Sequence, residues 1–269
     1  MKAIINSIAL AYDDQGKGVP FVFLHAFPLS RRMWDPQMAA LSPRFRVITV
    51  DLRGHGESDA PLWLYTLDQA ADDVAALLDH LSIGKAVFVG LSMGGYICFA
   101  FYRRFASRVQ ALVLADTRAG ADTPEGKAGR FQMAQTAYRQ GPAAIADLMI
   151  PKLLSPRTVQ TKPDLVHRVR AMIEGNQISG IAGDLMAMAE RPDSVPMLPT
   201  IACPALVLVG QEDLTTPPSE SRLISQRIPG ARLEIIPEAG HLSNLEQPDR
   251  FNRMVEEFVA GLGAANPSR

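Results

Sequence analysis

Short runs of hydrophobic residues alternate with helical patterns along the first half of the chain. The runs at residues 19–25, 46–51, 86–91 and 109–116 are nearly all apolar. Such strands suit a parallel sheet that is covered on both faces, rather than a sheet with one face in water. Between them, residues 67–81 carry apolar side chains at helical spacing. The alternation predicts an α/β fold with right-handed crossovers and an open, twisted sheet.

The same alternation returns near the C-terminus. Residues 205–209 and 232–236 are predicted strands, and residues 219–227 and 247–262 are predicted helices. The last of these helices is amphipathic, with its apolar side chains on one face. The two ends of the chain therefore share one architecture, and we expect them to build a single sheet.

The middle of the chain, residues 119–196, differs in character. It lacks strand-like runs, is helical in composition and is interrupted by prolines. We therefore predict that residues 1–118 and 197–269 form one α/β core. Residues 119–196 are predicted to form a helical cap or lid, inserted between the two halves of the sheet.

A catalytic motif joins a predicted strand to a predicted helix at residues 87–96, which read VFVGLSMGGY. It contains Gly-x-Ser-x-Gly centred on Ser92. A serine on a sharp strand-to-helix turn is held in a strained backbone and presents its Oγ above the sheet. The helix N-terminus and the N–H of Met93 are placed to stabilise a developing negative charge. The motif predicts Ser92 as a nucleophile and the Met93 N–H as an oxyanion donor.

A nucleophilic serine needs a base, and the base needs an orienting acid. His241 lies in the loop after the last predicted strand, and Asp213 directly follows the strand before it. Loops at the carboxyl ends of parallel strands meet at one edge of the sheet, where Ser92 also lies. The chain order is then Ser, Asp, His. Asp116 also ends a strand and is the alternative acid.

Four motifs together resemble the α/β-hydrolase superfamily, in its branch of small serine esterases and 3-oxoadipate enol-lactonase-like proteins. The resemblance covers nearly the whole chain and implies an α/β-hydrolase fold without a cofactor. It also implies that the Phe27 N–H joins that of Met93 in an oxyanion hole. It places His25 beneath the oxyanion loop as a structural residue, and His55 as a brace of the neighbouring turn. The motifs are HAFP at 25–28, DLRGHGES at 51–58, GLSMGG at 90–95 and GH at 240–241.

Charge and composition narrow the possible partners. The chain has 27 Lys and Arg against 28 Asp and Glu, a formal net charge of −1, which gives no sign of binding to nucleic acid or to a membrane surface. Cys98 and Cys203 make no disulfide framework and fit a reducing compartment. The N-terminal apolar run breaks at Asn6 and Ser7, which argues against a signal peptide, and no run is long enough for a membrane span, so we expect a cytoplasmic protein. Motifs for a metal or a dinucleotide are absent from the sequence, so neither is expected.

These features predict an enzyme that cleaves small to medium carboxylic esters through an acyl-enzyme. The same three side chains also fit a lactonase of the enol-lactonase type, or a slow-turnover receptor of the same fold. A lactone derived from a dicarboxylate needs a cation near the pocket, and Arg118, Arg130 and Arg139 are the candidates.

The predicted lid lies over Ser92, because both of its junctions fall on the sheet edge that carries the nucleophile. A lid there excludes water and builds an apolar pocket for the acyl group. Met133, Leu148 and Met149 are the side chains predicted to line this pocket.

Overall fold

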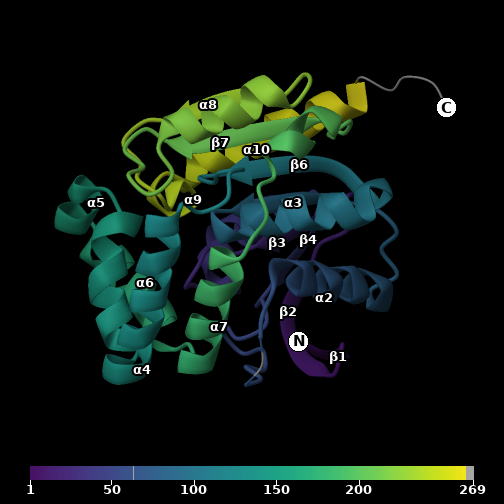
Figure 1. Cartoon of the computed structure of the whole chain (residues 1–269). Helices are drawn as coiled ribbons and strands as arrows, with labels where there is room; N and C mark the ends of the chain where they lie inside the picture. Colours follow the sequence, from purple (N-terminus) through teal and green to yellow (C-terminus); the bar gives the residue numbers. More distant parts are fainter. Residues whose placement is uncertain (63, 265–269) are drawn as a thin grey trace.

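In the computed structural model, which describes residues 1–62 and 64–264, eight strands form one sheet (Figure 1). Their order across the sheet is β1-β2-β4-β3-β5-β6-β7-β8. The β1–β2 and β2–β4 pairs are antiparallel, and the other neighbours are parallel. The predicted α/β fold is therefore confirmed. The strands are β1 Lys2–Ile5, β2 Ile8–Gln15, β3 Pro20–Leu24, β4 Arg46–Val50, β5 Ala86–Leu91, β6 Val109–Ala115, β7 Ala205–Gly210 and β8 Arg232–Ile236.

The sequence analysis did not predict the antiparallel β1–β2 hairpin at the N-terminus. β1 has only four residues, exposed and buried in turn, and β2 ends in the polar residues Asp13, Asp14 and Gln15. β1 is the edge strand and keeps one face in water, and the antiparallel β2 becomes polar toward its end, so neither is the continuous apolar run that marks the central strands. The local signal was the two-residue turn at Asn6 and Ser7, both with positive φ (47° and 67°), as tight hairpins require.

Helices cover both faces of the sheet. In Figure 1, α3 and α8 pass in front of the strands and α10 behind them. The three core helices predicted at residues 67–81, 219–227 and 247–262 each begin and end within two residues of α2, α8 and α10. The core helices are α1 Asp35–Leu41, α2 Leu67–His80, α3 Met93–Phe105, α8 Pro218–Arg227, α9 Ser243–Glu246 and α10 Pro248–Ala264.

The centre of the sheet is dry. All six residues of β5 are buried, and Phe88 on this strand packs against Phe101 of α3, with ring centroids 4.2 Å apart. Aromatic contact of this kind adds to the burial of apolar area. It fixes α3 against β5, so the turn between the two elements rests on a rigid support.

Four helices lie between β6 and β7 in sequence, and Figure 1 shows them grouped to one side of the sheet. They are α4 Pro124–Leu153, α5 Pro156–Thr161, α6 Pro163–Glu174 and α7 Ile178–Ala189. We call residues 119–196 the helical insertion. Gly141, with φ 78° and ψ 178°, interrupts α4 just before Pro142. Proline suits the first turn of a helix because its missing N–H has no partner there, and α4, α5 and α6 each begin with one.

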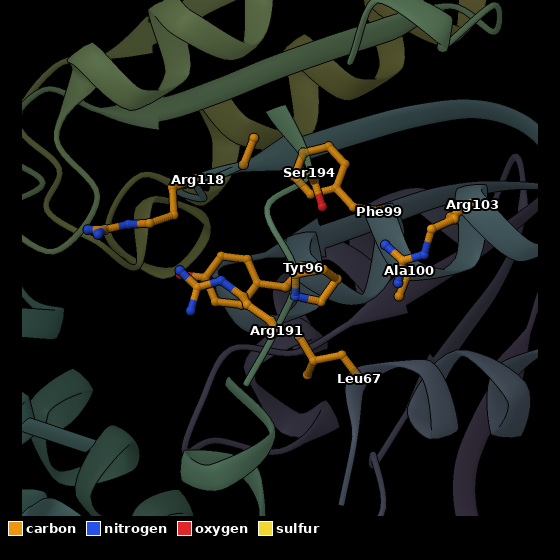
Figure 2. Close-up of a pocket in the computed structure, with 10 residues that line it drawn as sticks. Leu67, Tyr96, Phe99, Ala100, Arg103, Arg118, Arg191 and Ser194 are labelled. Carbon is orange, nitrogen blue, oxygen red and sulfur yellow. The ribbon is translucent and has the colours of Figure 1, made fainter. Parts of the chain in front are cut away.

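The two connections between the insertion and the sheet are joined to each other. Ser194 N donates to Ala119 O at 2.9 Å, and Arg191 Nη1 lies 2.7 Å from Asp122 Oδ1. The Arg191 guanidinium also lies over the ring of Tyr96, 4.3 Å from its centroid (Figure 2). The insertion thus leaves and rejoins the core as one paired stalk. Its function as a lid stays a prediction, and residues 265–269 of the predicted core lie outside the described residues.

No helix in the described part of the chain combines the length and hydrophobicity that a membrane span requires.

Candidate active site

Ser92 lies at the turn between β5 and α3, in the middle of the sheet. Its φ of 55° and ψ of −112° lie outside the regions that L-residues normally occupy. Such a conformation persists only when the surrounding structure holds it, and it is found mainly at functional sites. The side chain is only 8% exposed. The strained turn expected from the Gly-x-Ser-x-Gly motif is therefore present.

Close backbone packing holds this turn in place. A Cβ on Gly94 would come within 2.1 Å of Leu24 O, so only glycine lets the first turn of α3 approach β3 this closely. On the other side, Ser92 N donates to Ala115 O at 2.9 Å, and the Thr117 hydroxyl donates to Ser92 O at 2.8 Å. The turn that carries Ser92 is thus fixed by both neighbouring strands.

The structure brings the predicted base and acid together. His241 follows β8, Asp213 follows β7, and His241 Nδ1 lies 2.8 Å from Asp213 Oδ2 with both side chains buried. Thr215 N and Thr216 N donate to Asp213 Oδ1 at 2.8 and 2.9 Å, and the Thr216 hydroxyl donates to Oδ2 at 2.7 Å. The carboxylate has donors on both oxygens, so its orientation toward His241 is fixed.

Two opposing effects set the pKa of Asp213. Burial raises it, but the charge of protonated His241 and the hydrogen bonds from His241 and Thr216 outweigh burial and hold the pKa below its usual value. Asp213 is therefore ionised at neutral pH, as an acid that stabilises an imidazolium must be.

Asp116, the alternative acid, makes different contacts. Its Oδ1 accepts from Gly210 N at 2.7 Å, and its Oδ2 accepts from the hydroxyl of Ser243. Burial raises the pKa of Asp116 well above its usual value, and the charge of nearby Asp213 raises it further. Asp116 therefore links the end of β7 to residues 237–243, the segment after β8 that carries His241, which we call the histidine loop. Asp213 is the carboxylate that contacts His241.

Ser92, Asp213 and His241 all follow parallel strands at the same sheet edge, after β5, β7 and β8. Within residues 1–62 and 64–264, His241 Nε2 and Ser92 Oγ make no hydrogen bond to each other. Bonds of this kind often tighten only when substrate binds.

The loop after β3 carries the first predicted oxyanion donor, Phe27, and the start of α3 carries the second, Met93. Both residues are buried, and neither N–H donates a hydrogen bond within the described chain. Leu29 N donates to Ala26 O at 2.9 Å, which closes the loop into a turn. We call residues 25–29 the oxyanion loop.

His25 lies at the base of this loop with both ring nitrogens engaged. Nδ1 donates to Ala26 O and Nε2 accepts from Leu52 N, each at 3.0 Å, and these partners assign the neutral tautomer with the proton on Nδ1. Burial lowers the pKa of His25 to about 4, which agrees with a neutral ring. His25 thus ties the oxyanion loop to the turn after β4.

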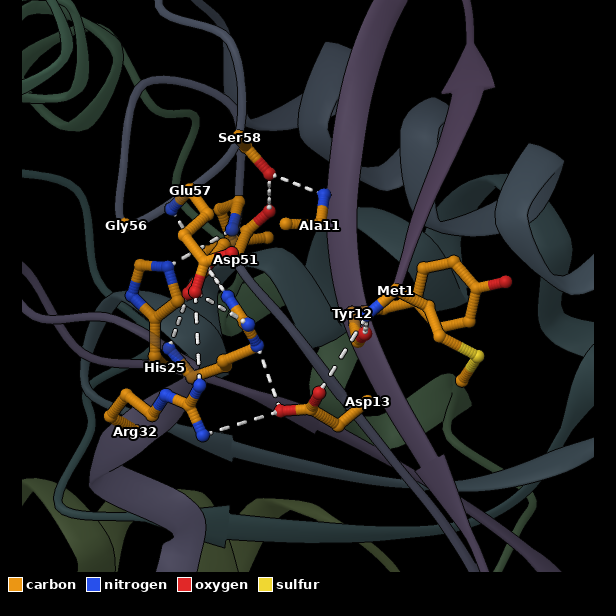
Figure 3. A network of polar contacts seen from close by, with 12 residues as sticks. Met1, Ala11, Tyr12, Asp13, His25, Arg32, Asp51, Gly56, Glu57 and Ser58 are labelled. Atoms are coloured by element: carbon orange, nitrogen blue, oxygen red, sulfur yellow. Dashed lines mark hydrogen bonds and ion pairs between the residues drawn. The ribbon is translucent and has the colours of Figure 1, made fainter.

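That turn, residues 51–58, is held by a buried ionic network (Figure 3). Asp51 Oδ1 accepts from Arg31 N at 2.7 Å, and Oδ2 accepts from Glu57 N at 2.9 Å and from the Arg31 guanidinium. His55 on the same turn lies 3.3 Å, Nδ1 to Oδ2, from Asp184 on α7. The turn is therefore braced from the core by Arg31 and contacts the insertion through His55.

Residues 19–248 match the sequence model of the alpha/beta hydrolase fold family. The chain belongs to this family. It is 32% identical over 256 residues to 3-oxoadipate enol-lactonase 2 of Acinetobacter baylyi, covering 94% of each protein.

Two solved structures resemble this hydrolase closely. One is a thermophilic esterase from Thermogutta terrifontis with malate bound, at 42% identity and a TM-score of 0.94, covering 97% of this chain and 98% of the esterase. The other is an enol-lactonase from Burkholderia xenovorans, at 34% identity and a TM-score of 0.91, covering 97% and 100%. The hydrolase thus has both esterase and enol-lactonase relatives.

The predicted pocket residues of this hydrolase occupy different environments. Met149 is buried, Met133 is partly buried against the core, and Leu148 is 44% exposed on α4. A hollow of about 530 Å³ lies between the insertion and the described residues just before α2. It is lined by Pro61, Leu62, Leu64, Tyr65, Ala134, Tyr138, Ser179, Ala182, Gly183 and Met186. The three predicted side chains do not line this hollow, and their place in a substrate pocket stays a prediction.

The structure distinguishes two of the three candidate cations. Arg130 is paired with Asp122 inside the insertion. The guanidinium of Arg118, whose side chain is labelled in Figure 2, instead donates to the carbonyl of Thr215, two residues after Asp213. Among the described residues, no group of three or more His, Cys, Asp or Glu side chains is arranged to hold a metal.

The sequence analysis missed three residues that support the site. Thr216 donates to Asp213, Thr117 donates to Ser92 O, and Glu246 Oε1 accepts from Gly240 N beside the base at 2.8 Å. Thr216 could have been found from the local sequence. An Asp side chain commonly accepts from the backbone N–H two residues later in an Asx-turn, and this turn brings the next residue, Thr216, against the carboxylate of Asp213. The other two contacts join separate segments, so no local pattern marks them.

Proposed function

We propose that this protein is a carboxylic ester hydrolase that works through an acyl-enzyme on Ser92. His241 takes the proton of Ser92 Oγ as Oγ attacks the carbonyl carbon of the ester. Asp213 keeps the remaining imidazole proton on Nδ1 and stabilises the imidazolium. The N–H groups of Phe27 and Met93 hold the oxyanion of the tetrahedral intermediate.

The intermediate then collapses, and His241 returns the proton to the departing alcohol. Water attacks the acyl-enzyme with His241 again as base, and Ser92 leaves with its proton restored. Besides the N–H groups of the oxyanion hole, these steps need only Ser92, His241 and Asp213 from the protein.

One observation carries this proposal: the buried 2.8 Å contact of His241 Nδ1 with an ionised Asp213, at the sheet edge where Ser92 occupies its strained turn. A structural His–Asp pair is common, but strain at the adjacent serine is the additional feature expected of a nucleophile.

Ser92→Ala tests the nucleophile directly. We expect it to reduce kcat on a p-nitrophenyl ester by on the order of 10⁴-fold or more, the loss seen when a triad member is removed. A serine-reactive phosphonate should add one adduct to the wild type, located at Ser92 by mass spectrometry, and none to the variant. Retention of most of the esterase activity by Ser92→Ala would rule the proposal out.

A lactonase is the second candidate, supported by the identity with enol-lactonases and by one cation. Arg118 is partly exposed. Its guanidinium donates to the carbonyl of Thr215, which lies two residues after Asp213 in the sequence. A lactone with a free carboxylate would meet this charge. We expect Arg118→Met to lower kcat/KM for such a lactone and to spare a neutral lactone of the same ring. Equal effects on both lactones would remove this candidate.

The helical insertion is proposed to act as the lid of this site. If Met149 and Leu148 line an acyl pocket beneath it, their replacement by Ala should change the preference among C2 to C10 esters. If they only pack within the insertion, the melting temperature falls and the preference for one chain length stays the same.

A slow-turnover receptor of the same fold is distinguished from an esterase by its kinetics. It would show an initial burst of product with no steady state.

A further inference from the structure

The helical insertion contacts the oxyanion loop through one buried amide. Asn176 lies between α6 and α7 and is only 5% exposed. Its Nδ2 donates to Pro28 O at 2.8 Å, with a longer contact of 3.4 Å to Leu29 O. Its Oδ1 accepts from Gly56 N at 2.7 Å. One side chain of the insertion thus joins two separate loops of the core.

These contacts act on the segment that must hold the Phe27 N–H in place. The core anchors the oxyanion loop at its start, where His25 donates to Ala26 O and accepts from Leu52 N. Asn176 anchors the loop at Pro28, on the other side of Phe27. Because Phe27 lies between the two anchors, the direction of its N–H depends on both.

We propose that Asn176 is a positioning residue for the oxyanion hole, and that the insertion uses it to hold the Phe27 N–H in line with Ser92. This inference rests on the proposed function. A misaligned donor stabilises the transition state less while ground-state binding changes little, because an oxyanion donor acts on charge that develops during the reaction.

Other contacts keep the insertion on the core when Asn176 is changed. The backbones of Gly54 and Gly180 touch, since a Cβ on Gly180 would lie 1.8 Å from Gly54 O. Ser179 Oγ donates to Ala60 O at 3.3 Å. Ser179→Ala therefore removes an insertion–core hydrogen bond that does not involve the oxyanion loop, and it is the matched control.

The experiment compares Asn176→Ala, Asn176→Asp and Ser179→Ala by kcat and KM on one activated ester. It also measures the Ki of a trifluoromethyl ketone, whose adduct with Ser92 places an oxyanion in the hole. Removal of a whole oxyanion donor costs about 10²–10³-fold in kcat, so misalignment of one should cost about 10-fold or more. We expect Asn176→Ala to lower kcat by this factor, to weaken the ketone equally and to change KM by less than about 3-fold.

Asn176→Asp separates the two bonds of the amide. Its carboxylate still accepts from Gly56 N but faces Pro28 O without a donor, so we expect the same loss as in Asn176→Ala. Ser179→Ala should leave kcat and the ketone Ki within about 2-fold of wild type, by the same reasoning about which contacts reach the hole.

Three results would overturn the inference. These are an unchanged kcat in Asn176→Ala, a loss confined to KM, or equal losses in Asn176→Ala and Ser179→Ala. Labelling of the wild type by the phosphonate distinguishes this failure from that of the proposed function. A wild type labelled at Ser92 limits the failure to Asn176, whereas an unlabelled wild type removes the nucleophile and this inference with it.

Discussion

The substitutions Asp213→Asn and Asp116→Asn should have very different effects on catalysis. Asp213 Oδ1 accepts from two backbone N–H groups, so the amide oxygen of Asp213→Asn must occupy that place. The amide NH₂ then faces His241 Nδ1, which now has to accept. The imidazole proton moves to Nε2, and the ring can no longer take the proton of Ser92.

The magnitude follows from this tautomer. In a serine protease the equivalent change costs about 10⁴-fold in kcat, or about 5 kcal/mol of transition-state stabilisation. We expect a loss of that size for Asp213→Asn here.

In Asp116→Asn the amide oxygen still accepts from Gly210 N, and the NH₂ donates to the Ser243 hydroxyl, which rotates to accept. His241 is not involved, so kcat should stay within about 10-fold of wild type.

The assay is kcat on a p-nitrophenyl ester at saturating substrate, with circular dichroism to show that both variants are folded. A loss in Asp116→Asn as large as that in Asp213→Asn would refute the assignment of the acid. It would make Asp116 the carboxylate that acts on His241 in the working enzyme.

Two further predictions concern stability. Gly180→Ala should destabilise the protein by about 1–3 kcal/mol, because its Cβ would meet Gly54 O, whereas Gly129→Ala on the exposed face of α4 should be neutral or stabilising; urea unfolding of both measures this. Asp116 has a raised pKa in the folded state, so its contribution to wild-type stability should fall as the pH rises from 4 toward that pKa, by about 1.4 kcal/mol for each pH unit. Asp116→Asn lacks this dependence, so its stability relative to wild type should increase from pH 4 to pH 8; a constant difference would contradict the raised pKa of Asp116.

The central sheet and the placement of Ser92, Asp213 and His241 at one sheet edge were predictable because their signals are local. The buried strands are continuous apolar runs, and Ser92, Asp213 and His241 each follow one of them within a few residues. Parallel topology then brings these strand ends to one edge. Position alone did not separate Asp213 from Asp116, because both follow a strand. Only their hydrogen-bond partners, His241 for Asp213 and Ser243 for Asp116, distinguish them.

The contacts that complete the site were not predictable in this way. Asn176 meets Pro28 across 148 positions of sequence, and its own surroundings resemble any turn between helices. The place of such a residue depends on how the insertion docks, which involves backbone contacts such as that of Gly180 with Gly54. A pattern of hydrophobic and polar residues within one helix carries no information about that docking.

The insertion meets the histidine loop as well as the oxyanion loop. Buried Glu246 accepts from Ser155 N of the insertion at 3.0 Å and from Gly240 N, beside the base, at 2.8 Å. Together with the bond of Asn176 to Pro28, this places insertion contacts on both loops that the proposed mechanism aligns with Ser92. Lifting the insertion as a rigid body would break both contacts. It would leave the buried carboxylate of Glu246 without one of its hydrogen-bond donors, and the free-energy cost of an unsatisfied group increases with its burial. Substitutions in the insertion should therefore alter kcat, because they change the position of these two loops, as well as altering substrate preference.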